Sequence, residues 1–444
     1  MRLWKRTTSG VPPPRRRRRG GREERLAIGL LLTLAVVWGT VLVGTLVALV
    51  ASPTKSVPTF PTVPTDSRPS AAFVVSDAPG AYESPLLVFT CRRDQYLRET
   101  LRDIWNYIPT DCSVGCPLVI SQDGNDPAVQ RVVREFTDEF ATKNVPVVHW
   151  THTSALRGGT NGYQALAIHY GWALRRVFDG QTLSGSVHGA KHGTPKRVII
   201  LEEDLHVAPD FFDYFAATAP LLDHDSSLLA VSAFHDNGFA HNVRNASRIL
   251  RSDFFPGLGW MMNRRLWVDE LQSKWPGGYW DDWLREPAQR QDRAILRPEI
   301  SRTYHFGTEG GTSSNQFGSH LSKILLNRET VDWSKAVDLE AQLRPEVYDP
   351  AYWAMVQAST LTYTIPDALE QAKKSNARLQ YTTIEQFKYL AHKLKLMADE
   401  KANVPRTAYK GIVETRPHGA DNFLFLTPPL AELQKEFDIP SPKR

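Results

Sequence analysis

Three consecutive carboxylates, Glu202, Glu203 and Asp204, follow a run of apolar residues. The run, 198–201, is β-branched and aliphatic throughout, which predicts a strand covered on both faces. Acidic groups at the C-terminal end of such a strand lie at the edge where open α/β sheets bind ligands. Because packed carboxylates repel one another, we expect a positive charge among them. Oxygen ligands suit Mg²⁺ or Mn²⁺, and such an ion usually also holds phosphate.

A helix is predicted directly after the acidic cluster. Pro209 suits a first helical position, and Phe211, Phe212 and Phe215 recur at helical spacing. The alternative to a ligand site is therefore a solvated acidic loop that does no more than cap this helix.

Two other predicted strands also end in polar side chains. Arg92 and Arg93 follow the strand at 86–90, and Asp123 follows the strand at 118–121. An arginine can hold a phosphate through two parallel hydrogen bonds, and a carboxylate can accept from a base edge or a ribose hydroxyl. The pattern suits a nucleoside diphosphate with a metal, although each residue taken alone is better interpreted as a surface charge. The chain has no phosphate-binding loop of the G-x-x-x-x-G-K-[ST] type.

Strands and helices alternate along the part of the chain that carries these residues. Strands are predicted at 86–90, 118–121, 145–149, 197–201 and 228–232, and helices at 97–108, 127–140 and 163–178. Asp126 followed by Pro127 is a typical helix start. Such alternation predicts an α/β fold with a mostly parallel sheet covered on both faces. After residue 330 a smaller α+β domain is predicted, with a capping box at Thr383 and Gln386.

Aromatic residues surround a second pair of carboxylates, Asp281 and Asp282. The aromatic residues are Trp275, Tyr279, Trp280 and Trp283. Trp and Tyr rings are suitable walls for a sugar ring, and a carboxylate among them is a candidate general base. The alternative is that Asp281 or Asp282 caps a helix beginning near Trp283 and that the tryptophans belong to the core. A Gly-rich polar segment at 306–317 predicts either a mobile lid with hydroxyls for a phosphate or a plain connector.

The charge is distributed unevenly along the chain. The net charge is +5, but residues 1–25 carry +8, which leaves −3 for the remainder and no basic face for nucleic acid. Residues 26–51, from Leu26 to Ala51, contain no charged side chain and are long enough to cross a lipid bilayer. The basic residues before them predict a cytosolic tail at 1–25 and a type II signal-anchor. A Pro/Ser/Thr-rich stem at 52–84 would then carry a lumenal catalytic domain at 85–330 and a second domain at 331–444.

The chain has three cysteines, Cys91, Cys112 and Cys116. In a lumenal compartment two of them are expected to pair, leaving one free thiol, and they are too few for a structural zinc site. Asn245 begins an Asn-Ala-Ser sequon and is a candidate glycosylation site.

The motifs above occur together, in the same order, in one known family. They are Ser-Gln-Asp at 121–123, the cluster and helix at 202–215, 254–260, Trp-Asp-Asp-Trp at 280–283, Arg-Pro-Glu-Ile-Ser-Arg at 297–302, and 404–412. In these segments the chain resembles the N-acetylglucosaminyltransferase I family over about residues 85–426. The resemblance implies a Golgi membrane enzyme with a GT-A fold. It also implies Mn²⁺-dependent, inverting transfer of N-acetylglucosamine from UDP-N-acetylglucosamine to the 2-hydroxyl of the α-1,3-linked mannose of an N-glycan.

The resemblance also implies roles for residues on the nucleotide side. Arg93 matches an arginine near the nucleotide, and Asp123 matches the carboxylate that binds uracil. Glu202 would lie near the donor sugar and Glu203 near the ribose. Asp204 would be the single protein ligand of Mn²⁺.

On the sugar side, the resemblance makes Asp281 the general base and Trp280 a donor-sugar contact. In the lid, Thr312 or Ser313 would touch the diphosphate. Two other functions stay open at this stage, since acceptor choice lies in surface loops. One is a related GT-A transferase acting on O-linked mannose, and the other is a membrane-tethered, lectin-like module without turnover.

The chain departs from the family pattern at several positions. Glu203 stands where the family usually has Asp, so the expected ribose contact is one methylene longer. Gly124, Ala230 and Ile295 replace family cysteines. If Cys91 is bridged in this chain, its partner must therefore be Cys112 or Cys116.

Overall fold

The computed structural model describes residues 83–153, 162–179, 194–309, 317–336 and 338–437, which belong to one compact unit of the chain. Within these ranges no helix combines the length and apolar character needed to cross a membrane. The predicted anchor at 26–51 and the lid residues Thr312 and Ser313 lie outside the described residues.

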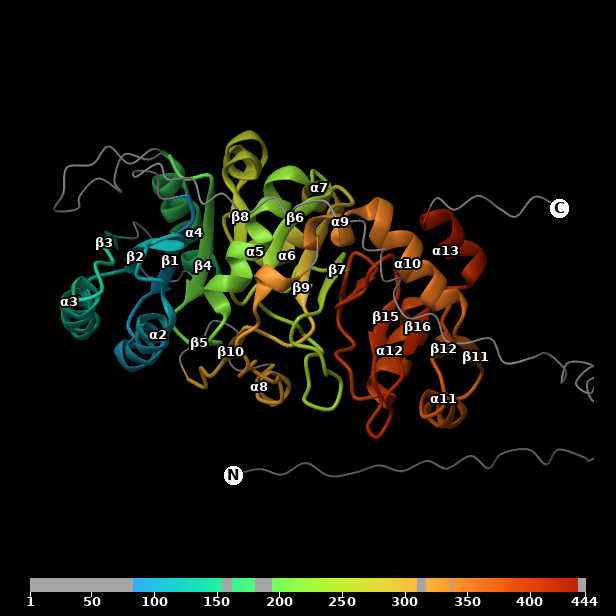
Figure 1. Ribbon diagram of the computed structural model, residues 1–444. Coiled ribbons are helices and arrows are strands. Elements are labelled where there is room, and N and C mark those ends of the chain that lie inside the picture. The colour runs from blue at the N-terminus through green and yellow to red at the C-terminus, as the bar shows by residue number, and fades with distance from the viewer. Residues whose placement is uncertain (1–82, 154–161, 180–193, 310–316, 337, 438–444) are drawn as a thin grey trace, which may run out of the picture. The chain divides into compact units, whose positions relative to one another are not determined.

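An eight-stranded sheet carries the first domain. Its strands are β1 (Pro85–Thr90), β2 (Gly115–Asp123), β3 (Val147–His152), β4 (Arg197–Glu202), β6 (Leu228–Ser232), β7 (Ile249–Ser252), β8 (Trp260–Asn263) and β9 (Ala294–Pro298). They lie in the order β3-β2-β1-β4-β8-β6-β9-β7 (Figure 1). Strands β3, β2, β1 and β4 are parallel, as are β6 and β9, whereas β8 and β7 run antiparallel to their neighbours. The predicted α/β class is confirmed, and the sheet is mixed.

Helices cover both faces of the parallel half of the sheet. They are α2 (Asp94–Tyr107), α3 (Pro127–Ala141), α4 (Gly162–Asp179) and α5 (Phe211–His224). Leu86 and Val88 of β1 pack with α2, α3 and α5, whereas Leu87 and Phe89 pack with α4. Because successive strand side chains point to opposite faces, an unbroken apolar strand is what a sheet with two covered faces requires.

A local sequence signal sets the start of α3 but not that of α5. The Asp126 side chain accepts hydrogen bonds from the backbone N–H groups of Ala128 and Val129, at 2.8 and 3.3 Å, and α3 then begins at Pro127. The predicted start of α5 at Pro209 is wrong, since Asp210 is the N-cap and the helix begins at Phe211. The Asp210 side chain makes no capping hydrogen bond because it is committed to a buried arginine.

Short elements lie between the strands of the main sheet and between its last strand and the C-terminal region. They are β5 (Leu205–Val207), η2 (Leu266–Leu271), η3 (Gln272–Lys274), α6 (Trp280–Arg285), α7 (Pro287–Arg290), β10 (Thr303–His305), α8 (Gly318–Leu321), η4 (Trp333–Lys335) and α9 (Leu339–Leu343). β10 pairs antiparallel with β5, and this pairing sets His305 opposite Leu205.

A second, four-stranded sheet forms the α+β region in the order β11-β12-β16-β15 (Figure 1). Its elements are α10 (Pro345–Gln357), β11 (Thr360–Thr362), α11 (Ile365–Ala372), β12 (Ala377–Gln380), α12 (Ile384–Lys393), β13 (Glu400–Lys401), β14 (Val404–Pro405), β15 (Val413–Thr415), β16 (Leu424–Thr427) and α13 (Leu430–Glu436). Thr383 caps α12 by accepting from the N–H of Gln386. The Gln386 side chain accepts from the N–H of Thr382, whereas a capping box would use the N–H of the N-cap Thr383. The reciprocal bond of the predicted capping box is therefore displaced by one residue.

An ion pair between Arg302 and Asp210 lies in the core with neither side chain exposed. The guanidinium Nη2 lies 2.9 Å from Asp210 Oδ2, and the Asn327 amide donates to Oδ1 at 2.8 Å. Asp210 precedes α5 and Arg302 precedes β10, so the pair fixes two elements that follow and flank the acidic cluster.

We expect Asp210→Ala to destabilise the protein by about 3–5 kcal/mol, because it leaves the Arg302 guanidinium buried without a counter-charge. The measurement is the urea midpoint of the purified protein. The control is Glu135→Ala, which removes the partner of Arg98 in an exposed pair and is expected to cost less than about 1 kcal/mol. Equal shifts in the two variants would contradict this account of the buried pair.

Candidate active site

Arg93 supplies the positive charge that the acidic cluster requires. Its Nε donates to Glu203 Oε1 at 2.6 Å, and its Nη1 lies 2.9 Å from Asp204 Oδ2. Glu203 is buried, and its other oxygen accepts from the Thr90 hydroxyl and from the N–H of Cys91. All of these donors come from the end of β1, which lies beside β4 in the sheet. Both oxygens of Glu203 are thus occupied: Oε1 positions Arg93, and Oε2 is held by Thr90 and Cys91.

The three carboxylates differ in their electrostatic surroundings. Burial raises the pKa of Glu202 to about 7, the charge of Asp204 adds to this, and the hydroxyl of Tyr170, which donates to Glu202 at 2.8 Å, opposes it. Burial also raises the pKa of Glu203, although Arg93 opposes the shift. For Asp204, burial acts to raise the pKa, but the hydrogen bond and charge of His305, together with Arg93, outweigh it and lower the pKa. Asp204 is therefore the one member of the cluster whose pKa is lowered.

Asp204 has the features of a ligand for a hard cation. Its side chain is buried, with the residue 3% exposed, and its Oδ1 has no hydrogen-bond partner. A Cβ at position 307 would lie 2.5 Å from Asp204 Oδ2, so Gly307 lets the backbone approach the carboxylate closely. His305 Nε2 lies 3.4 Å from the same oxygen. The described residues contain no group of three or more His, Cys, Asp and Glu side chains arranged for a metal.

Stacked aromatic rings link the acidic cluster to α6. Phe89 stacks on Tyr170 with ring centroids 3.9 Å apart, and Tyr170 stacks on Trp280 at 4.4 Å. Trp280 also stacks on Trp260 and is only 6% exposed, so its ring belongs to the core, as the alternative interpretation expected of the tryptophans. Its contact with a donor sugar stays a prediction. The stack places the start of α6 beside Glu202.

Asp281 lies in the first turn of α6 with its side chain 35% exposed. The helix begins at Trp280 and is preceded by Tyr279, so neither Asp281 nor Asp282 is its N-cap. Arg285 Nη1 contacts Asp281 Oδ2 at 3.0 Å and Asp282 Oδ1 at 2.8 Å. Arg285 is itself buried and donates to the carbonyl of Phe255. Asp281 is thus an accessible carboxylate in a fixed orientation, which is what a general base needs.

Asp123 lies at the end of β2, opposite His152 of β3. His152 Nδ1 and Asp123 Oδ1 are 2.7 Å apart, and the His152 ring stacks on His169 of α4 at 5.2 Å. His169 Nε2 lies 2.7 Å from the Ser121 hydroxyl. The sequence analysis missed both histidines. β2 and β3 are parallel and their last residues, Asp123 and His152, lie opposite each other. Aligning the ends of the two predicted strands was the signal that could have identified His152.

Cys112 and Cys116 form a disulfide, and Cys91 is a free, half-buried thiol. The condition under which Cys91 would pair with either of them is therefore not met, and the expected single pair with one free thiol is confirmed. Asn245 is exposed, and its Oδ1 accepts from the N–H and the hydroxyl of Ser247. Its glycosylation stays a prediction.

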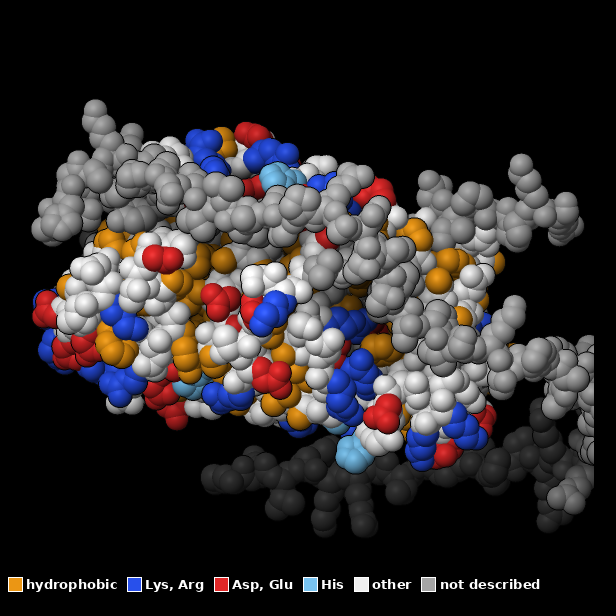
Figure 2. Space-filling view, in the orientation of Figure 1, with side chains coloured by type: hydrophobic (Ala, Val, Ile, Leu, Met, Phe, Trp, Pro, Cys, Tyr) orange, Lys and Arg blue, Asp and Glu red, His pale blue; other side chains and the backbone are white. Residues whose placement is uncertain are grey.

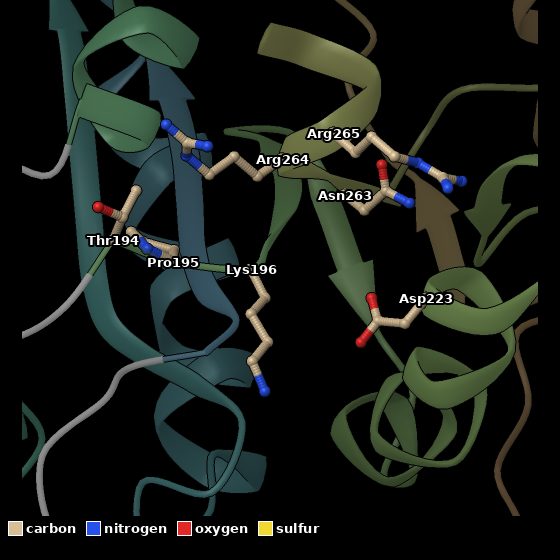
Figure 3. A pocket seen from close by; sticks show the side chains of 7 residues that line it. All are labelled: Thr194, Pro195, Lys196, Asp223, Asn263, Arg264 and Arg265. Atoms are coloured by element: carbon tan, nitrogen blue, oxygen red, sulfur yellow. The ribbon is translucent and has the colours of Figure 1, made fainter. Parts of the chain in front are cut away.

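A cavity of about 510 Å³ lies at the opposite edge of the sheet, where β4 begins and β8 ends. It is lined by Thr194, Pro195, Lys196, Asp223, Asn263, Arg264 and Arg265. In Figure 3 the side chains of Lys196, Arg264 and Arg265 extend in different directions. Lys196 is paired with Glu83, and Asp223 with Arg197. This cavity therefore offers no convergent set of polar groups for a ligand.

The described surface in Figure 2 carries basic and acidic side chains interspersed over the face shown. The site at the ends of β1, β2 and β4 is instead defined by a few buried and half-buried charges. Its parts are Arg93, the carboxylates at 202–204, Asp123 and, beyond the aromatic stack, Asp281.

Comparison with known proteins identifies the family. The model of the GNT-I family matches residues 63–439. A relative from Arabidopsis thaliana, named alpha-1,3-mannosyl-glycoprotein 2-beta-N-acetylglucosaminyltransferase, is 38% identical over 335 residues, which cover 74% of this chain and 71% of the relative. The chain belongs to the GNT-I family. The family resemblance inferred from the sequence motifs is thereby confirmed.

Two solved structures are similar at a lower level. The mannosyltransferase PcManGT from Pyrobaculum calidifontis, in complex with GDP-Man and Mn²⁺, matches with a TM-score of 0.33 and 14% identity, over 67% of this chain and 81% of that chain. TarS 1–349 from S. aureus matches with a TM-score of 0.32 and 12% identity, over 65% of this chain and 78% of that chain. With TM-scores this low, neither similarity supports a conclusion about this chain.

The stability of the protein is expected to depend on pH through His169. Burial, followed by the charge of His152, lowers the pKa of His169 from 6.5 to about 3. Between these two pH values the unfolded chain binds a proton that the folded chain does not. The contribution of His169 to the free energy of unfolding is therefore at its maximum above about pH 6.5 and decreases as the pH drops towards 3.

We expect His169→Gln, which keeps an amide near Ser121, to flatten the decline of the urea midpoint between about pH 7 and pH 5. The exposed His418 provides the control, and His418→Gln should leave the decline unchanged. An unaltered decline in His169→Gln would show that His169 is not the group responsible.

Proposed function

We propose that this chain transfers N-acetylglucosamine from UDP-N-acetylglucosamine to the 2-hydroxyl of the α-1,3-linked mannose of an N-glycan, with inversion at the anomeric carbon. Membership of the GNT-I family and the name of the Arabidopsis relative support the reaction and the acceptor. At the level of residues, one observation carries the proposal. A single aromatic stack links the acidic cluster to the accessible Asp281, and in that cluster Asp204 has a lowered pKa and an Oδ1 without a hydrogen-bond partner.

The donor nucleotide would occupy the edge formed by the ends of β1, β2 and β4. Asp123 would accept from the uracil, and Arg93, held by Glu203, would face the diphosphate. Glu202, hydrogen-bonded to Tyr170, would lie near the donor sugar. Glu203, which stands where the family usually has the shorter Asp, is at the position proposed for ribose contact. Its burial supports a further role in positioning Arg93. Thr312 or Ser313 would contact the diphosphate from the lid.

Asp204 fits a role as ligand of Mn²⁺, because it combines a lowered pKa with a buried oxygen that has no partner. When bound there, the ion supplies the positive charge that a departing diphosphate requires. The chain itself contributes Arg93 on the same side, whose guanidinium stays charged at any physiological pH.

Asp281 would remove the proton from the acceptor hydroxyl as its oxygen attacks the anomeric carbon from the face opposite the leaving group. Arg285 holds the Asp281 carboxylate through Oδ2 at 3.0 Å, which fixes its direction. Because a binding module needs no general base, this arrangement favours an enzyme of the GT-A type over a lectin-like module.

The proposed location is the Golgi membrane, with a single type II span at 26–51 and the catalytic region in the lumen. The excess of Lys and Arg at 1–25, directly before the span, supports this orientation. The Cys112–Cys116 disulfide and the exposed sequon at Asn245 agree with an oxidising, glycosylating compartment.

The direct test is transfer by the purified chain, using UDP-N-acetylglucosamine, Mn²⁺ and a five-mannose N-glycan, with and without a chelator. We expect a product with the new sugar on the α-1,3 arm, and we expect it to disappear with the chelator. UDP binding without any product on this acceptor would contradict the proposed acceptor and favour another one, such as O-linked mannose. UDP release without transfer to any acceptor would contradict the proposed activity.

Replacing the proposed base is expected to affect turnover and not donor binding. Asp281→Asn should lower the turnover rate by roughly 10²–10⁴-fold, because the amide cannot take the proton, while calorimetric affinity for UDP stays unchanged. Asp282→Asn is the matched control, since Asp282 contacts the same Arg285 nitrogen and is more exposed, at 48%. If both variants lost turnover equally, the shared contact with Arg285 would be the cause, and Asp281 would not be the base.

A further inference from the structure

Tyr279, two residues before Asp281, is a large aromatic side chain that stays 49% exposed. One face of its ring stacks on Tyr163 of α4, with ring centroids 4.5 Å apart and 22° between the planes. No second ring pairs with Tyr279 in the described part of the chain, so the accessible part of its ring is the other face and the edge. The sequence analysis named Tyr279 among the possible walls for a sugar, and none of the roles proposed above uses it.

We propose that the stacked rings of Tyr279 and Tyr163, which we call the tyrosine platform, bind the mannose ring whose hydroxyl is presented to Asp281. The inference rests on the proposed function, because it requires Asp281 to act on an acceptor hydroxyl. A hexose carries C–H groups on its ring faces and hydroxyls around its edge, so an exposed tyrosine face is a suitable surface for it.

The platform lies along α4 from the place proposed for the donor sugar. Tyr163 and Tyr170 are seven residues apart in this helix, so they share one face of it and lie about 10 Å apart along its axis. Tyr170 contacts Glu202 and stacks on Trp280, whereas Tyr163 stacks on the preceding residue, Tyr279. Two consecutive residues before Asp281 therefore contact two tyrosines of one helix face, one at the donor end and one at the platform.

The charge of Asp281 acts on both of these tyrosines. Burial raises the pKa of Tyr163, and the charge of Asp281 adds to the rise. Burial also raises the pKa of Tyr170, and the charges of Glu202 and Asp281 add to it. Asp281 thus lies close to the donor end and to the platform at once. A base needs this position if an acceptor bound on one side of it is to attack a donor bound on the other.

The backbone fixes the ring of Tyr279. Its φ is 47°, in the left-handed region that a bulky side chain rarely adopts, and its carbonyl accepts from the N–H of Trp283 at 3.0 Å. A Cβ at position 278 would lie 3.2 Å from Gln164 Cγ, so Gly278 lets this segment pack closely on the start of α4. Residues held in such conformations cluster at ligand sites, which agrees with a binding role for Tyr279.

Charged side chains border the platform. Lys401 Nζ of β13 lies 3.8 Å from Asp282 Oδ2 and 3.7 Å from Glu286 Oε1. The side chains of Lys401, Asp282 and Glu286 are 32%, 48% and 45% exposed. An apolar ring face with a few polar groups beside it is the composition of a sugar-binding site, since the polar groups pair with the hydroxyls. Through Lys401 the C-terminal region contributes to this border.

The test uses the full chain, purified in detergent, with saturating UDP-N-acetylglucosamine and Mn²⁺ and with a five-mannose N-glycan as the varied acceptor. Tyr279→Asn removes the ring, and Asn tolerates a positive φ better than other side chains, so the backbone is kept. We expect the KM for the glycan to rise at least about tenfold, with kcat changed less than about twofold, because the platform binds the acceptor equally before and during the reaction. Calorimetric affinity for UDP should stay unchanged.

Three further variants complete the test. Tyr279→Phe keeps the ring face and should retain the wild-type KM within about twofold. Tyr163→Ala removes the supporting ring without changing position 279, and it should raise the KM by a smaller factor than Tyr279→Asn does. Tyr363→Asn is the matched control, because Tyr363 is an exposed tyrosine of the C-terminal region, at 85%, and should leave both constants unchanged.

The failures of the two proposals are distinguishable. Transfer by the wild-type chain together with an unchanged KM in Tyr279→Asn and Tyr163→Ala would overturn the platform and leave the proposed function intact. An equal rise in Tyr279→Phe and Tyr279→Asn would also overturn it, because the hydroxyl and not the ring face would then bind the acceptor. A loss of UDP affinity that matches the rise in KM would overturn it as well. Absence of transfer by the wild-type chain to any acceptor would overturn both proposals.

Discussion

The site depends on one constraint. The negative charge of three adjacent carboxylates at the end of a buried strand must be balanced by positive groups and hydrogen-bond donors. Glu202, Glu203 and Asp204 leave β4 together, and burial raises the pKa of the first two. Arg93 binds both Glu203 and Asp204, and His305 contacts the same oxygen of Asp204 as Arg93 does. The result is a division of roles in which Glu203 positions an arginine, Asp204 has a lowered pKa and an oxygen without a partner, and Glu202 has a pKa raised to about 7.

That compensation requires β1 and β4 to be neighbours. Arg93 follows β1, and the parallel pairing of β1 with β4 brings the ends of both strands to the same edge of the sheet. The buried pair of Arg302 and Asp210 then fixes the start of β10, and β10 carries His305 to the same place. The sugar side is fixed separately, because Tyr170 contacts Glu202 at one end and stacks on Trp280 at the other.

The sequence predicted the parts of the fold that are governed by local patterns. The apolar run ending at Leu201, the Asp126-Pro127 helix start and the Thr383 cap are decided within a few residues, and the structure confirms them. Strands β7 and β8 were missed because they are four residues long and gain their pairing from distant segments. The start of α5 was misplaced because Asp210 is bound to Arg302, 92 residues away in the chain.

In the site, too, local motifs predicted some residues, whereas contacts between distant segments decide others. Clustered motifs pointed to Asp123, Glu202, Asp204 and Asp281. The sequence did not reveal that Glu203 is held inside the protein by three donors at and just after the end of β1, nor that Trp280 packs in the core. His152 and His305 were missed for a common reason: each enters the site through strand register, and no short motif records which residues lie opposite each other on neighbouring strands.

The most direct test of this account is an experimental structure of the chain with UDP-N-acetylglucosamine and Mn²⁺. The account predicts the diphosphate beside Arg93, the metal on Asp204, and the anomeric carbon open to Asp281. It would be contradicted by a donor bound at the opposite edge of the sheet, in the cavity lined by Lys196, Arg264 and Arg265.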